Sequence, residues 1–141
     1  MWRKEWVRRR SSIARCPAPA AVGVSGSHSV IADRPPGKSG GMGLGFDGGE
    51  LLALSIGGCF CNDLQALADQ EGVEIAYLKV TVTIDFGGQP SRATSARMNV
   101  QCTLVDGSDP SPLIERAKAI TTIGNSLRAG VPVEISRGSD A

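Results

Sequence analysis

The chain has 141 residues, the length of one domain, and its 41% apolar and 21% charged residues are typical of a globular protein. The net charge of +1 hides an asymmetry, because residues 1–20 carry six Lys and Arg against one acid and residues 21–141 carry nine against thirteen. The larger part is therefore mildly acidic and lacks the basic footprint of a nucleic-acid-binding protein, so we expect no nucleic-acid partner.

Residues 1–20 predict a basic tail, either disordered or preceding the natural start, so that a single domain spans residues 21–141. An acid-poor leader bearing Arg and Ser also fits an organelle transit peptide. The segment lacks the apolar core of a secretory signal, so we expect a cytoplasmic protein. Its four cysteines are then thiols rather than disulfides: Cys16, Cys59, Cys61 and Cys102.

Residues 21–32 alternate loosely around a Ser-Gly-Ser centre, which predicts a short hairpin of residues 22–24 with residues 30–32. The Asp33-Arg-Pro-Pro run ends this hairpin, because proline cannot continue a ladder. Residues 38–49 are rich in glycine but lack the endings and spacings of phosphate-binding and dinucleotide-binding loops. They predict a flexible loop that leads into the next element.

The longest apolar stretch, residues 51–67, predicts a helix, since it is too long for one strand. It is apolar on most sides, so we expect burial on most sides. The stretch is too short and too interrupted to span a bilayer, and we expect no membrane partner. Asp47 is the expected start of the helix, and Gly72, in the left-handed cap position, is its expected stop.

Two glycines, Gly57 and Gly58, lie in the centre of this helix, each costing about 1 kcal/mol relative to alanine. Their presence indicates that another segment packs closely there, or that a small molecule must reach the next residue, Cys59. Cys59 is therefore a candidate reactive thiol. The alternative is an inert small hydrophobe, the usual state of a buried free cysteine.

The pattern then changes to period two over residues 78–86 and again over residues 98–104, which predicts an antiparallel pair with Cys102 on its apolar side. Apolar residues at helical spacing predict a second helix from Ser111 to about residue 129, and residues 131–135 predict a final edge strand. The fold class is therefore α+β, with antiparallel strands and segregated helices.

Several stretches resemble the OsmC/Ohr family, the osmotically inducible and organic hydroperoxide resistance proteins, and in particular its less characterised OsmC-like branches. The resemblance covers roughly residues 21–136. It rests on the Asp33-Arg-Pro-Pro run, the Gly40-Gly41 loop, the Glu50-Leu-Leu-Ala-Leu-Ser-Ile-Gly-Gly-Cys59 helix and the Asn125-Ser-Leu-Arg-Ala-Gly-Val-Pro-Val133 run. It implies antiparallel sheets, a long buried central helix that carries the cysteine, and an intertwined homodimer.

The resemblance also implies that Cys59 attacks a small organic hydroperoxide and is rescued, as a sulfenic acid, by an external thiol reductant. A free thiol with a pKa of about 8.5 needs an activating group to be a thiolate at neutral pH. Arg34 or Arg128 are candidates for this group across a dimer, and Glu50 is a second catalytic candidate because it lies next to the position of a family glutamate.

This chain departs from the hydroperoxide-specific members at two positions. Thr121 stands where they have a second cysteine, and Gly49 stands where they have the glutamate. Cys61 does not replace the missing thiol within the helix, because residues i and i+2 point roughly 200° apart. A disulfide between Cys61 and a cysteine of the partner chain remains an alternative. His28 and two cysteines do not form a four-ligand zinc site, so we expect no metal and no cofactor.

The sequence thus predicts a thiol peroxidase that uses one cysteine, Cys59, and acts as a homodimer. A second hypothesis is a non-catalytic dimeric protein that binds small molecules and has lost the redox cycle. A third is a stress-induced structural dimer in which Cys59 only packs.

Overall fold

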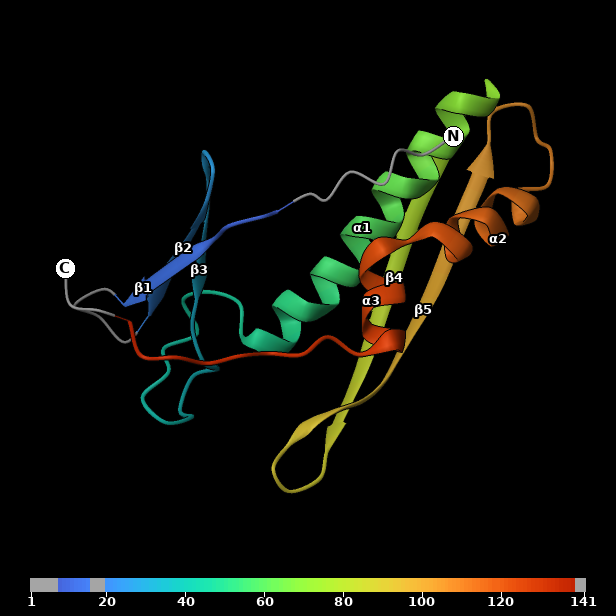
Figure 1. Ribbon diagram of the computed structural model, residues 1–141. Coiled ribbons are helices and arrows are strands. Elements are labelled where there is room, and N and C mark those ends of the chain that lie inside the picture. The colour runs from blue at the N-terminus through green and yellow to red at the C-terminus, as the bar shows by residue number, and fades with distance from the viewer. Residues whose placement is uncertain (1–7, 16–19, 139–141) are drawn as a thin grey trace. The chain divides into compact units, whose positions relative to one another are not determined.

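The computed structural model describes residues 8–15 and 20–138, which fall into two compact units, Met1–Leu52 and Ala53–Ala141 (Figure 1). Cys16 lies outside the described residues. The elements in chain order are β1 (Ser12–Arg15), β2 (Ala21–Ser25), β3 (His28–Ala32), α1 (Gly48–Glu71), β4 (Ile75–Gly87), β5 (Arg92–Leu104), α2 (Ser111–Ile120) and α3 (Thr122–Ala129). Two antiparallel sheets and a long helix confirm the predicted α+β class.

The first unit contains a three-stranded antiparallel sheet in the order β1-β2-β3. β2 and β3 form the predicted hairpin, with Val22 opposite Ile31, and Gly26 in its turn has a φ of 59°, a conformation that favours glycine. β1 pairs with β2 from within the first twenty residues, where we expected a tail rather than an element. Four residues with one large apolar side chain, Ile13, carry too little alternation to be recognised in a sequence.

The glycine-rich loop folds back on the end of β3. Asp33 is 8% exposed, and its carboxylate accepts hydrogen bonds from the backbone N–H groups of Arg34 (2.7 Å), Met42 (3.1 Å) and Leu44 (3.0 Å). Phe46 closes the loop by donating its N–H to the carbonyl of Ile31 at 3.0 Å. The segment is the predicted loop, but it is tied at defined points rather than left free.

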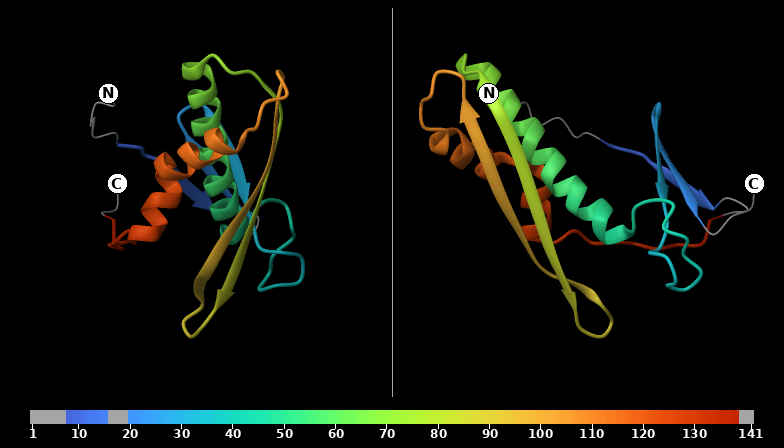
Figure 2. Two further views of the ribbon diagram at one scale, coloured as in Figure 1. Left: turned by 90° about the vertical axis from the view of Figure 1, so that its right-hand side faces the viewer. Right: turned by 180° about the vertical axis from the view of Figure 1, so that it is seen from behind.

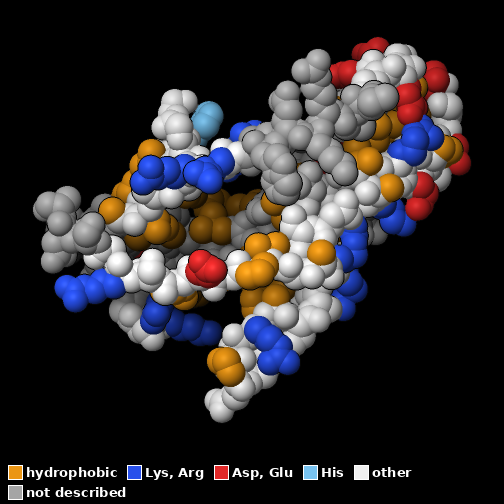
Figure 3. Space-filling view, viewed as in Figure 1, with side chains coloured by type: hydrophobic (Ala, Val, Ile, Leu, Met, Phe, Trp, Pro, Cys, Tyr) orange, Lys and Arg blue, Asp and Glu red, His pale blue; other side chains and the backbone are white. Residues whose placement is uncertain are grey.

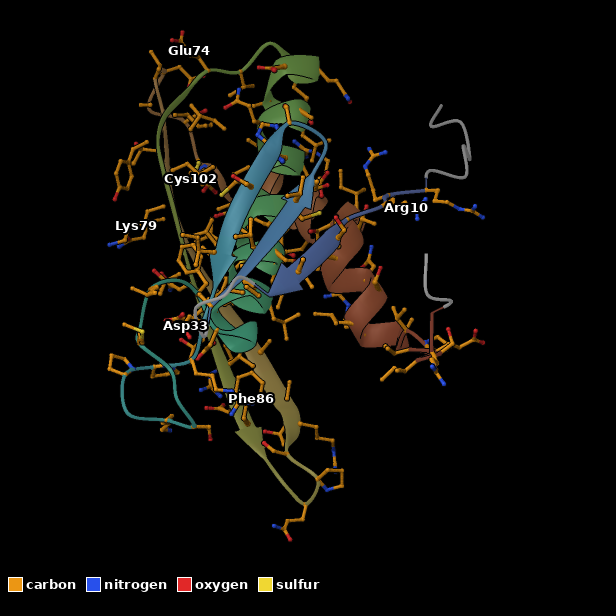
Figure 4. The ribbon with its side chains drawn as sticks, turned by 90° about the vertical axis from the view of Figure 1, so that its left-hand side faces the viewer. Arg10, Asp33, Glu74, Lys79, Phe86 and Cys102 are labelled. Carbon is orange, nitrogen blue, oxygen red and sulfur yellow. The ribbon has the colours of Figure 1, made fainter. Side chains whose placement is uncertain are left out.

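The second unit is built on the long β4–β5 hairpin, which confirms the predicted antiparallel pair and extends it to 13 residues in each strand. Val80 lies opposite Val100, and Leu78 lies opposite Cys102. Figure 4 shows Lys79 pointing away from α1, as the alternation of the strand requires. The hairpin thus has one face against the core and one in solvent.

α1 runs along this hairpin in all views (Figures 1 and 2). Its buried residues Ile56, Phe60, Leu64 and Ala68 recur every four positions, and the last three pack with Leu104, Leu113 and Ala117 in the core cluster. Within the described ranges α1 is the one helix long and apolar enough to cross a membrane by length and composition. One face of α1 packs in the core of this unit, but only 28% of its apolar window is buried in the single chain, whereas we expected burial on most sides.

The C-terminal third differs from the prediction in two ways. The expected single helix from Ser111 is divided at Thr121, whose ψ of 112° interrupts it between α2 and α3. The predicted edge strand at residues 131–135, all of which are described, is not formed. Pro132 offers no N–H to a ladder, and no described strand pairs with this segment, so Val131, Val133 and Ile135 stay 60%, 81% and 93% exposed.

Candidate thiol site on α1

Helix α1 begins with a capping box. The N–H of Glu50 donates to Oδ1 of Asp47 at 2.8 Å, and the N–H of Asp47 donates to Oε2 of Glu50 at 2.9 Å. This reciprocal pair satisfies free backbone donors at the start of a helix. The expected start at Asp47 is confirmed, and so is the stop, because Gly72 follows the last helical residue with a φ of 67°. Glu50, a predicted catalytic residue, therefore has a structural task as the second half of the cap.

Cys59 lies in the middle of α1 as a free, half-buried thiol. The two glycines before it face different surroundings. A β-carbon at Gly57 would lie 3.2 Å from Cγ2 of Val82 and 3.6 Å from Cγ1 of Val80, so Gly57 permits close packing of α1 on β4. A β-carbon at Gly58 would meet no described atom within 4 Å beyond the helix itself. The helix surface next to Cys59 is therefore open on the Gly58 side.

The one hydrogen bond of the Cys59 side chain within the described part of the chain runs to Asp63, one helical turn later. Sγ donates to Oδ2 of Asp63 at 3.6 Å. The i, i+4 spacing on a helix is the signal that could have identified this pair from the sequence. The Asp63 carboxylate accepts this hydrogen bond and orients the thiol. A thiolate needs a cation or hydrogen-bond donors nearby, and a carboxylate provides neither.

The other two described cysteines lie in different surroundings. Cys102 packs against the core cluster from β5, which confirms its predicted place on the apolar side of that strand. Burial raises the pKa of Cys61 and that of Cys102, because a charged thiolate is disfavoured away from water. Both therefore carry a smaller fraction of the reactive thiolate at neutral pH than a cysteine in water does.

Each of the two arginines named as possible activators has its own contacts. Arg128 of α3 donates to Oδ1 of Asn125 and, at 3.5 Å, to the carbonyl of Lys118. The backbone N–H of Arg34 donates to Asp33 in the first unit, and its side chain is exposed. Thus the contacts described for Cys59 include neither guanidinium.

Thr121, which the resemblance places where other members have a second cysteine, lines a cavity of about 700 Å³ between β5, α2, α3 and the Ile56–Phe60 face of α1. It is 4% exposed, and its hydroxyl has no hydrogen-bond partner among the described residues. Cys59 does not line this cavity. Sequence reasoning had singled out Thr121 only as a lost thiol.

No set of three or more His, Cys, Asp or Glu side chains suited to a metal ion comes together in residues 8–15 and 20–138. Asp and Glu side chains do gather where α1 ends and β5 leads into α2 (Figure 3). Glu71, the last residue of α1, forms an ion pair with Arg116 at 2.6 Å, and this pair ties α2 to the end of α1.

The sequence matches the family described as OsmC-like protein over residues 40–136, and the chain belongs to that family. A comparison with curated proteins gives no match. The resemblance seen in the Glu50–Cys59 helix is thereby confirmed at the level of the family.

Solved structures share the fold at low identity. An OsmC-like protein of unknown function from Vibrio cholerae gives a TM-score of 0.74 at 12% identity, covering 85% of this chain and 93% of that one. An OsmC-like protein from Mycoplasma pneumoniae gives 0.75 at 14%, covering 88% and 89%. An organic hydroperoxide resistance protein OsmC from Legionella pneumophila gives 0.64 at 14%, covering 89% and 92%. At these identities the likeness concerns the fold.

Proposed function

We propose that this OsmC-like protein reduces small organic hydroperoxides in the cytoplasm with a single reactive cysteine, Cys59. The observation that carries the proposal is the position of Cys59, a free and half-buried thiol on the core helix beside the open backbone of Gly58. Family members of the same fold are described as organic hydroperoxide resistance proteins, among them the protein from Legionella pneumophila.

The reaction needs one thiol on the protein and two equivalents of an external thiol. The Cys59 thiolate attacks the terminal oxygen of ROOH and the O–O bond breaks, so that Cys59 becomes a sulfenic acid. The alkoxide that leaves takes up the proton that the thiol released and departs as the alcohol ROH. A first external thiol condenses with the sulfenic acid to a mixed disulfide and releases water. A second external thiol attacks that disulfide, restores Cys59 and leaves as the oxidised disulfide. Thr121 cannot act as the second cysteine, so the external thiol performs both steps.

The active form in this proposal is a homodimer. Support comes from apolar side chains left in solvent in the single chain: Leu54 on α1 is 54% exposed, and Val133 and Ile135 are 81% and 93% exposed. Exposed apolar surface of this kind marks protein interfaces. The Asp63 carboxylate beside Cys59 adds a second reason, because the cation that a thiolate needs must approach from elsewhere. A second copy is one source, with Arg34 or Arg128 as its candidates.

The experiment follows the loss of cumene hydroperoxide with dithiothreitol as reductant, for the wild type and for Cys59→Ser. We expect the substitution to abolish turnover and Cys102→Ser to retain it. Mass spectrometry after one equivalent of peroxide locates the oxidised cysteine, which we expect to be Cys59 rather than Cys61 or Cys102. Unchanged turnover in Cys59→Ser would end the proposal.

The oligomeric state is tested separately. Light scattering during gel filtration measures the molecular mass of the protein in solution, and the mass of a monomer would refute the proposed homodimer.

Glu50 is tested separately because it also caps α1. Gln serves in a capping box as well as Glu, so Glu50→Gln keeps the cap and removes only the charge. If Glu50 takes part in the reaction, the substitution lowers turnover while the unfolding free energy stays within about 0.5 kcal/mol. Turnover equal to the wild type would leave Glu50 with the cap alone.

A second candidate, a non-catalytic dimer that binds small molecules, is favoured by Thr121 in place of a cysteine and by the cavity that Thr121 lines. Native mass spectrometry of the purified protein should then detect a bound apolar ligand, and ligand-free protein should fail to reduce peroxide. Rapid turnover by the ligand-free protein would refute this candidate.

The third candidate is a structural dimer in which Cys59 only packs. Cys59 would then react slowly with a thiol reagent, and fast labelling would refute this candidate.

A further inference from the structure

The cavity in the second unit combines an apolar wall with an uncommitted polar group. Ile56 and Phe60 of α1 and Met98 and Val100 of β5 are among the residues that line it. Thr121 lines it as well, and it is the residue that precedes α3. A threonine at this position normally accepts a hydrogen bond from the backbone of the first turn, but Thr121 forms no such cap. Its hydroxyl is therefore buried and without a partner among the described residues, and it reaches a ligand only when the side chain turns toward the cavity.

A guanidinium lies close to the same place. Gly124 lines the cavity, and a β-carbon there would lie 3.0 Å from Cγ2 of Thr121 and 3.7 Å from Nη1 of Arg128. A β-carbon at position 124 would crowd the Thr121 methyl group, so the glycine lets Thr121 and Arg128 both lie close to this point of α3. A rotation of Thr121 about χ1 brings Oγ1 to the staggered position that Cγ2 now holds.

Arg128 is the cation at this cavity whose charge is least compensated. Among the three basic residues of the lining, Arg97 pairs with Asp85 at 3.0 Å and Lys118 pairs with Glu115 at 2.9 Å. The hydrogen bonds described for Arg128 go to a side-chain amide oxygen and a backbone carbonyl, both neutral. A planar guanidinium without an acidic partner favours a carboxylate, which it can bind through two parallel hydrogen bonds.

We propose that this cavity binds a small amphipathic carboxylate. The carboxylate accepts hydrogen bonds from the Arg128 guanidinium and, after its rotation, from the Thr121 hydroxyl. The hydrocarbon chain lies on the partly exposed apolar side chains of the lining, Met98, Val100 and Leu127. The volume of about 700 Å³ is within the range of ligand sites, which combine an apolar lining with a few polar groups. The proposal does not depend on Cys59, which lies outside the cavity.

The test uses the full chain, stripped of bound molecules, and three probes of equal chain length: decanoate, decanol and decylamine. Isothermal titration below the aggregation concentration of each probe gives the affinities. We expect decanoate to bind at least tenfold more tightly than decanol and decylamine not to bind. Arg128→Gln should lower the affinity for decanoate by about tenfold and leave the affinity for decanol unchanged. Arg128→Lys keeps the charge but lacks the planar guanidinium, so its affinity for decanoate should lie between those of the wild type and Arg128→Gln.

Thr121→Val removes the hydroxyl at constant side-chain shape and should lower the affinity for decanoate by about three- to tenfold. The matched control is Lys79→Gln, which removes one positive charge from the opposite face of the hairpin and should leave all affinities unchanged. Circular dichroism establishes that each variant is folded. Equal binding of decanoate and decanol, undiminished binding by Arg128→Gln, or no binding of decanoate to the wild type would each overturn the proposal. If a second copy of the chain fills the cavity, decanoate will not bind to the wild type, and the proposal is overturned in that case as well.

Discussion

Thr121→Val is the sharpest test of the packing around the α2–α3 break. Thr121 is 4% exposed, and its hydroxyl has no partner among the described residues. A buried polar group without a hydrogen bond costs about 1–3 kcal/mol. Valine replaces the hydroxyl with a methyl group of the same shape and loses no cap, because Thr121 forms none. We therefore expect the unfolding free energy to rise by about 1–2 kcal/mol.

The adjacent residue provides the control. Thr122 is exposed, and its contact with Ser126 uses its backbone carbonyl, which a valine retains. Thr122→Val should change the unfolding free energy by less than about 0.5 kcal/mol. Urea unfolding followed by circular dichroism compares both variants with the wild type, and an unchanged m value indicates that stability alone has changed. A loss of about 1 kcal/mol in Thr121→Val would show that the hydroxyl has a partner in solution, and the reasoning would fail.

Three further substitutions test other parts of the fold. Leu64 is fully buried, so Leu64→Ala should lower the unfolding free energy by about 2–5 kcal/mol in urea. Asp47→Ala removes half of the capping box and should cost about 0.5–2 kcal/mol in the same assay. The N–H of Leu44, with those of Met42 and Arg34, holds the pKa of Asp33 below its usual value. Asp33 therefore adds stability above its unfolded pKa of about 3.9 that is lost as the pH falls through the lower folded value, and Asp33→Asn should flatten acid unfolding there.

The parts of the fold that depend on local signals could be predicted from the sequence. α1 is bounded by a capping residue, Asp47, and by a glycine with positive φ, Gly72, and both are chemical requirements of a helix end. The β4–β5 hairpin follows from alternation, because period two places one set of side chains on the core whatever the rest of the chain does. Cys102 could be placed in the core for the same reason.

Long-range choices of partner could not be predicted. Asp33 was visible as the start of a proline turn, but its hydrogen bonds reach N–H groups nine and eleven residues later, and no spacing rule specifies them. Glu50 was visible as an acidic residue near the family glutamate, and its bond to Asp47 follows the capping-box spacing only once the helix start is fixed. A role inherited from the family and a role in the cap compete for the same carboxylate, and sequence alone does not separate them.

The break at Thr121 and the missing strand at residues 131–135 share one physical reason. Periodicity reports which side of an element is apolar, but it does not report whether the backbone continues or what covers that side. Helical spacing persists from Leu113 to Leu127 across a residue with ψ of 112°, so the two helices are read as one. Alternation in residues 131–135 likewise expresses a preference for pairing, and a strand forms only beside a second strand that offers its backbone groups. The described part of this chain offers none to that segment, which is why its apolar side chains remain in solvent and why the proposal of a second copy has a physical basis there.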